Sequence, residues 1–166
     1  MGVALRVASA RARPHASRLR KDAARLLAAI GLKRSELSII IVDDATIRGL
    51  NREFRGKDSP TDVLSFSQVE EIGAAPPDLH KLVDRPGLML GDVVISIDTA
   101  LKQASRYKVS PAMRLRTLMI HGVLHLVGYD HERSRADARK MFARERELAG
   151  AIANSKPRTP RKRSGR

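Results

Sequence analysis

The segment that begins at Ser110 constrains the fold more than any other part of the sequence. Ser110 and Pro111 form a typical helix start, with serine as the N-cap and proline at the first helical position. From Leu115 to Val127 the helix is apolar on nearly every side, which predicts that it is buried. An arginine and two histidines interrupt this stretch, and it falls short of the roughly 20 residues that span a membrane. We therefore expect a central core helix and no membrane partner.

Helices and short strands are mixed around this segment without strict alternation. Amphipathic spacing and capping residues, among them Asp44 and Asp98 as N-caps, predict further helices at residues 15–30, 44–55, 98–106 and 134–151. Short apolar runs predict strands at residues 36–42, 61–67 and 91–97, and glycine and proline predict a loop at 70–87. This order indicates an α+β fold: one domain with a small mixed sheet packed by several α-helices.

Charge is concentrated at the two ends of the chain. The 166 residues contain 32 lysine and arginine against 18 aspartate and glutamate, a formal charge of +14. Residues 1–25 and 154–166 each carry +6, which leaves +2 for the residues between them. Residues 154–166 have no apolar side chain, so we expect a basic flexible tail after a single domain of residues 1–153. Such a charge favours a polyanionic partner, and nucleic acid is the first candidate.

Composition also excludes several kinds of site. The chain has no cysteine, so a disulfide framework, a cysteine-ligated metal and a cysteine nucleophile are excluded. With 3% aromatic residues and no tryptophan, few side chains are present on which bases could stack. Any metal must be held by His, Asp or Glu, and any nucleic acid mainly through its phosphates.

Three histidines lie within the eleven residues HGVLHLVGYDH. His121 and His125 are four residues apart, which places both imidazoles on one face of the buried helix. Gly128 can end the helix in a left-handed conformation and return His131 to the same place. Three imidazoles with an open fourth position are typical of a catalytic zinc site. The alternative is a set of hydrogen-bonded core histidines, which is disfavoured because three buried basic rings would repel one another.

The same spacing occurs in a class of zinc proteases in which a glutamate follows the first histidine and acts as the general base. Here that position is Gly122, which weakens the prediction of a metallopeptidase. An anionic substrate would instead require an arginine that faces the metal.

Three segments together resemble one known family. HGVLHLVGYDH (residues 121–131), FRGKDSPTDVLSF (54–66) and LGDVVIS (90–96) closely resemble the YbeY family of metal-dependent endoribonucleases, the rRNA maturation factors of bacteria. The resemblance covers roughly residues 35–149. It implies that His121, His125 and His131 bind one zinc ion, or another divalent transition metal, and that Arg55 is the functional arginine.

Arg55 offers a planar guanidinium that suits the paired oxygens of a phosphodiester, but its chemistry alone fits an ordinary surface arginine better. It is the resemblance that implies a catalytic and substrate-binding role for Arg55. Asp58 and Asp62 flank a proline turn and are expected to cap backbone groups. Asp130 either orients a histidine ligand, caps backbone groups or forms a surface salt bridge. No general base is identified.

The resemblance implies a cytoplasmic enzyme that cleaves single-stranded RNA. It would act in maturation of the 3' end of small-subunit rRNA and in ribosome quality control. Its partners would be ribosomal RNA, the small subunit and ribosome-associated proteins, without DNA specificity. The alternative is an RNA-binding assembly factor with a structural zinc and no turnover. The absence of an obvious fourth ligand favours the enzyme.

Overall fold

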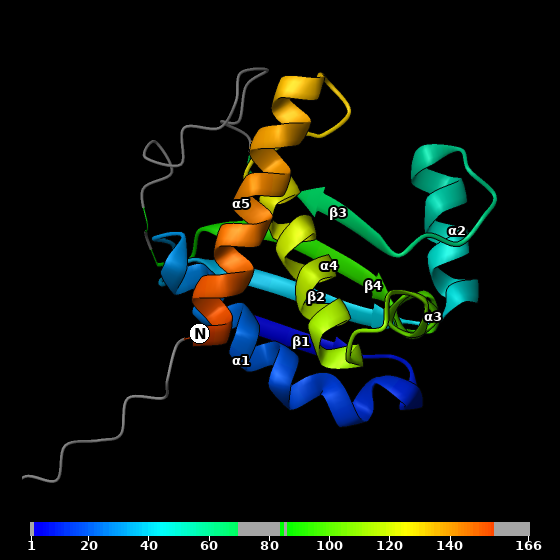
Figure 1. The fold of residues 1–166 in the computed structure, drawn as a ribbon. Helices are drawn as coiled ribbons and strands as arrows, with labels where there is room; N and C mark the ends of the chain where they lie inside the picture. The colour runs from blue at the N-terminus through cyan, green and yellow to red at the C-terminus, as the bar shows by residue number, and fades with distance from the viewer. Residues whose placement is uncertain (1, 70–83, 85, 155–166) are drawn as a thin grey trace, which may run out of the picture.

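A mixed four-stranded sheet is the frame of the protein (Figure 1). The computed structural model describes residues 2–69, 84 and 86–154. Its strands are β1 (Val3–Val7), β2 (Glu36–Val42), β3 (Val63–Ser67) and β4 (Met89–Ser96). They lie in the order β1-β2-β4-β3, with β1, β2 and β4 parallel and β3 antiparallel to β4. The predicted α+β class with a small mixed sheet is confirmed.

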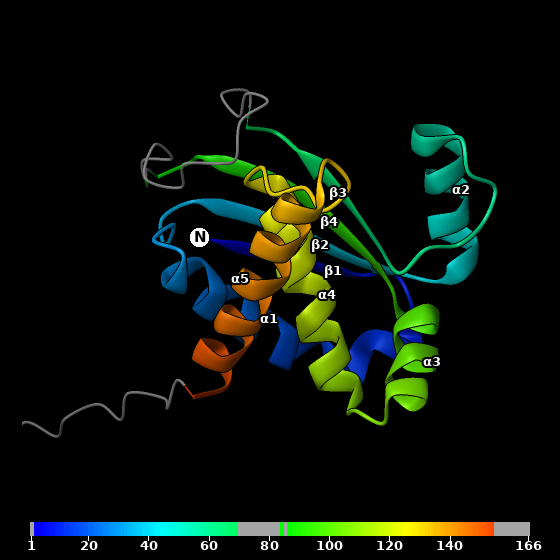
Figure 2. The ribbon, with the colours of Figure 1, turned by 45° about the horizontal axis from the view of Figure 1, so that its top comes forward.

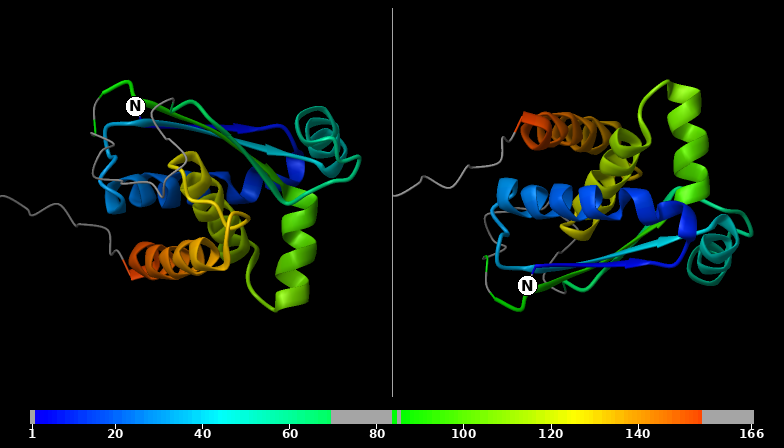
Figure 3. Two further views of the ribbon diagram at one scale, coloured as in Figure 1. Left: turned by 90° about the horizontal axis from the view of Figure 1, so that it is seen from above. Right: turned by 90° about the horizontal axis from the view of Figure 1, so that it is seen from below.

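Helices cover the two faces of the sheet unequally. They are α1 (Arg13–Ala29), α2 (Asp44–Arg55), α3 (Ile97–Tyr107), α4 (Pro111–Leu126) and α5 (Arg135–Asn154). Figure 3 shows α1, α4 and α5 together on one side of the sheet and α2 at its end on the opposite side. Among the residues described, no helix has the length and apolarity to cross a membrane.

The alternation of side chains along the strands produces two apolar clusters. In β2, Leu37, Ile39 and Ile41 point into the main core beneath α1 and α4. Ile40 packs against a smaller cluster on the other face, in which Val42 and Val94 meet Ile47 of α2. Helix α4 lies at the centre of the main core, and nine of its sixteen residues are buried. The predicted buried central helix is therefore confirmed.

Strand β1 was not predicted. Residues 3–7 alternate between half-buried and exposed positions and pair in parallel with β2. The segment is short, lies at the edge of the sheet and contains Arg6, so its apolar signal is weak. The basic start of the chain is thus built into the domain as β1 and α1.

Two helix caps differ from the predicted ones by one or two residues. Asp43, and not Asp44, caps α2 by accepting a hydrogen bond from the backbone N–H of Thr46 (2.8 Å). Ser96, and not Asp98, caps α3. The reason is tertiary, because Asp44 accepts hydrogen bonds from Ser96 and Thr99 at the junction of β4 and α3. The cap of α4 at Ser110 is as predicted.

Gly122 allows α4 to lie directly on the sheet. A Cβ atom at this position would be 2.6 Å from Cγ1 of Val93. Two serines of β3 complete the contact, because Ser65 donates to the carbonyl of Gly122 (3.0 Å) and Ser67 to that of Leu126 (2.9 Å). The helix that carries the histidines is thereby fixed against β3 and β4.

Two predicted segments lie largely outside the described residues. They are the loop at residues 70–87 and the basic tail at residues 154–166, of which Asn154 is the last residue of α5.

Candidate metal centre

The three histidines converge at the C-terminal end of α4. His121 and His125 lie one turn apart on the helix, and His131 lies in the loop that leads to α5. One ring nitrogen from each lies within 4.8 Å of the others. The Nε2 atoms of His121 and His125 are 3.1 Å apart. The approach that the spacing predicts is present, and Figure 2 shows this end of α4 beside β3.

The chain returns to the helix through a tight turn. Gly128 has a φ of +100°, and its N–H donates to the carbonyl of His125. Asp130 accepts a hydrogen bond from the N–H of Glu132 (2.8 Å) and pairs with Arg133 (3.5 Å). Of the three roles that the sequence left open for Asp130, these contacts correspond to capping and to a salt bridge.

The protonation state of His125 and an unpaired nitrogen of His131 suit a metal ion. Burial, and then the charges of His121 and His131, lower the pKa of His125 to about 4. His125 is therefore neutral at pH 7, the form in which imidazole binds metals. Nδ1 of His131 is buried and has no hydrogen-bond partner among the described residues. A buried nitrogen without a partner is costly, and a bound cation would satisfy it. The donor set fits a divalent transition metal.

A carboxylate that the sequence analysis did not assign to the site contacts the first histidine. Oε1 of Glu145 on α5 is hydrogen-bonded to Nδ1 of His121. The side chains of Glu145 and His121 are only 15% and 20% exposed. Helical spacing from the buried Met141 and Leu148 places Glu145 on the packed side of α5. An acidic residue at a buried position of a helix is unusual, and this is the sequence feature that could have indicated a role for Glu145.

Arg55 reaches the same cleft from the other side. It is the last residue of α2, and Gly56 ends that helix in the left-handed conformation. A cleft of about 560 Å³ is lined by Arg55, the three histidines and residues of β3. Nη2 of Arg55 lies 3.5 Å from Oε1 of Glu132, and the Arg55 side chain is 42% exposed. The structure therefore brings Arg55 and the histidines to one cavity.

The two aspartates near the proline turn have structural partners. Asp58 forms an ion pair with Arg48 (2.9 Å), whose hydrogen bond lowers the pKa of Asp58. Asp62 accepts from the N–H of Val63 (2.8 Å) and from Gln103. Backbone capping is confirmed for Asp62, whereas Asp58 pairs with a side chain.

Comparison with known proteins identifies the family. A family model described as Endoribonuclease YbeY matches residues 8–153. The chain belongs to this family. Proteins named Endoribonuclease YbeY from Geobacter metallireducens and Geobacter sulfurreducens are 50% and 45% identical to it. These matches span 133 and 139 residues, or 79% and 82% of this chain and 82% and 86% of the relatives.

A solved structure supports the fold alone. The solution structure of a protein from Thermotoga maritima aligns with a TM-score of 0.60 and 22% identity, covering 95% of this chain and all of the other. The YbeY family match contains the three histidines, Arg55 and Glu145, whereas β1 and the basic residues after Asn154 lie outside it.

Proposed function

We propose that this protein is a metal-dependent endoribonuclease that cleaves single-stranded RNA in small-subunit rRNA maturation and ribosome quality control. One observation carries the proposal: three imidazoles converge in a cleft that also receives an arginine from a different helix. Membership of the YbeY family supports the same activity.

His121, His125 and His131 would hold the ion, for which we propose zinc, with another divalent transition metal as the alternative. When bound, the ion would supply a Lewis acid that activates water for attack on phosphorus. Arg55 would bind the phosphate oxygens through its guanidinium and orient the scissile bond. The contact of Arg55 with Glu132 is exposed and long, so a phosphate can displace it.

Packing explains why a peptidase is disfavoured. A general-base glutamate at position 122 would place its Cβ against Val93, where α4 touches the sheet. The histidine spacing is therefore that of the zinc proteases, but the packing at position 122 leaves no room for a general-base glutamate.

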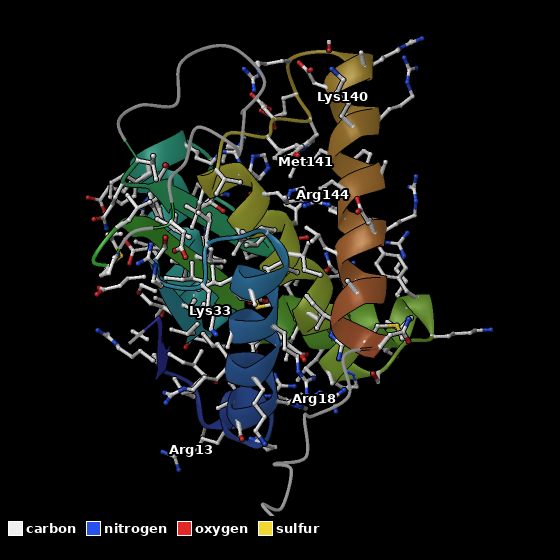
Figure 4. The ribbon with its side chains drawn as sticks, turned by 90° about the vertical axis from the view of Figure 1, so that its left-hand side faces the viewer. Arg13, Arg18, Lys33, Lys140, Met141 and Arg144 are labelled. Carbon is white, nitrogen blue, oxygen red and sulfur yellow. The ribbon has the colours of Figure 1, made fainter. Side chains whose placement is uncertain are left out.

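A basic surface supports binding of RNA through its phosphates. Asp22 is the sole acid among residues 1–25, and it is 1% exposed and paired with the buried Arg116 (2.9 Å). Asp22 also pairs with Arg18 (3.7 Å) and Arg25 (3.6 Å) of α1, but its carboxylate is buried, so the exposed side of α1 presents cations and no exposed carboxylate. Figure 4 views this side of the molecule, with Arg13, Arg18 and Lys33 labelled around α1 and Lys140 on α5. We propose that residues 154–166 extend this basic surface beyond the domain of residues 1–153.

Ribosomal RNA and the small subunit, with ribosome-associated proteins, are the proposed partners, without DNA specificity. The cytoplasm, where ribosomes assemble, is the proposed location.

The experiment that tests the proposal uses end-labelled single-stranded RNA with the sequence of a small-subunit rRNA end. The wild-type protein should cleave it internally, whereas chelator treatment and His125→Ala should each abolish cleavage. His15→Ala, which removes a histidine of α1 outside the cluster of three, is the matched control and should keep wild-type activity. If the metal-loaded wild-type protein binds the RNA but does not cleave it, the result would contradict the proposal and favour an assembly factor.

A further inference from the structure

Glu145 links helix α5 to the metal centre on helix α4. Its Oε1 contacts Nδ1 of His121, 24 residues earlier in the chain. Both side chains are mostly buried, and neither belongs to the loop that carries His131. The contact therefore links α5 to α4 through Nδ1 of His121, a proposed metal ligand.

The position of Glu145 on α5 is costly without a partner. Met141 and Leu148, one turn away on either side, are 0% and 2% exposed. A carboxylate between them loses hydration, and it must recover that loss through a hydrogen bond or a charge. Glu147, two residues later, is 67% exposed and pairs with Arg144 (2.8 Å) at the surface. Only the first of these two glutamates faces the core.

The contact determines which nitrogen of His121 is available. A carboxylate accepts a hydrogen bond, so Nδ1 of His121 carries the proton and Nε2 keeps its lone pair. That Nε2 atom is the one that lies 3.1 Å from Nε2 of His125, inside the ligand cluster. A carboxylate on the remote nitrogen also increases the basicity of the ligating nitrogen.

We infer that Glu145 is a positioning residue, which fixes the tautomer and ring orientation of His121 so that Nε2 faces the metal. This inference rests on the proposed metal-dependent function. Loss of such a partner typically weakens metal binding by about 10–100-fold.

The test compares Glu145→Ala and Glu145→Gln with Glu147→Gln as the matched control on the same helix. The first readout is the tautomer of His121 in the metal-free protein, measured by ¹⁵N NMR of the histidine rings. We expect Nδ1–H in the wild type and a shift toward Nε2–H in Glu145→Ala. The second readout is zinc affinity by chelator competition, which should fall about 10–100-fold in Glu145→Ala and less in Glu145→Gln, which retains an acceptor oxygen.

Unchanged zinc affinity and an unchanged His121 tautomer in folded Glu145→Ala would overturn the inference. If that variant does not fold, Glu145→Gln decides through zinc affinity, because it keeps the size of the side chain and an acceptor oxygen but removes the charge. Zinc affinity equal to that of the wild type in Glu145→Gln would then overturn the inference. Both readouts are independent of RNA. A wild type that binds zinc and shows the expected shifts but cleaves no RNA would refute the proposed function and leave this inference standing.

Discussion

The residues of the proposed site come from four parts of the fold: Arg55 from α2, two histidines from α4, His131 from the loop after α4, and Glu145 from α5. His121 and His125 follow from helix geometry alone. The prediction for His131 also depended on a chain reversal at Gly128, and the φ of +100° at Gly128 confirms that reversal. Glu145 was missed because its partner lies on another helix, and a glutamate on a helix is usually exposed. Contacts between distant segments depend on packing, which local patterns do not contain.

Arg55 is predicted to act through the geometry of its guanidinium and not only its charge. Arg55→Lys keeps the positive charge but loses the planar fork that binds two phosphate oxygens. We expect kcat/KM for RNA cleavage to fall by about 10²-fold, while the zinc content remains unchanged. Arg52→Lys, one turn earlier on α2, is the control and should have little effect. Full activity of Arg55→Lys would show that charge alone suffices.

At the scale of helices and strands, the central elements were easier to predict than the edges. Strand β2 was predicted with its observed bounds, because a short apolar run has few other uses. β1 was missed because an edge strand with an arginine lacks that signal. The caps at Asp43 and Ser96 could not be distinguished from the nearby aspartates, since the choice depends on a junction formed by distant segments.

Packing of α4 on the sheet is predicted to depend on Gly122. Gly122→Ala would place a methyl group against Val93 and Ser65, which we expect to destabilise the protein by about 1–3 kcal/mol. Gly150→Ala on α5 is the matched control, because nothing lies within 4 Å of its added Cβ. It should stabilise the protein by up to about 1 kcal/mol through helix propensity. Urea denaturation measures both changes, and wild-type stability of Gly122→Ala would refute the close contact.

At the scale of the whole molecule, the structure shows where the basic residues near the start of the chain lie. The sequence placed +6 in residues 1–25 and predicted the helix there, but not that its one acid would be buried against Arg116. That pairing needs α4 beside α1, which no local pattern shows. The consequence is an exposed basic side on α1, separate from the cleft that the histidines line.

This basic side is predicted to contribute to RNA affinity and not to catalysis. Replacing Arg13, Arg20 and Lys21 by glutamine should weaken RNA binding and flatten its dependence on salt. The slope of log K against log[salt] should change by about 0.7 for each RNA phosphate that the variant no longer neutralises. Arg106→Gln on α3 controls for a general loss of charge. The triple variant of α1 should cleave a short oligonucleotide at the wild-type rate. An unaltered salt slope would exclude α1 from the RNA interface.

The basic tail is predicted to act in the same way. Deletion of residues 155–166 removes six cationic side chains and no part of α5. Affinity for long RNA should fall and its salt dependence should decrease, with the melting temperature unchanged. Equal affinity and equal salt dependence before and after deletion would show that the tail does not contact RNA.

The central claim is that the three histidines hold the metal ion required for RNA cleavage. The most direct measurement is the cleavage rate of single-stranded RNA by metal-stripped protein as zinc is added back. The rate should rise from near zero and saturate at about one ion per chain, and His125→Ala should remain inactive at the same zinc concentrations. Cleavage at the full rate by the metal-free protein, or by His125→Ala, would contradict the claim.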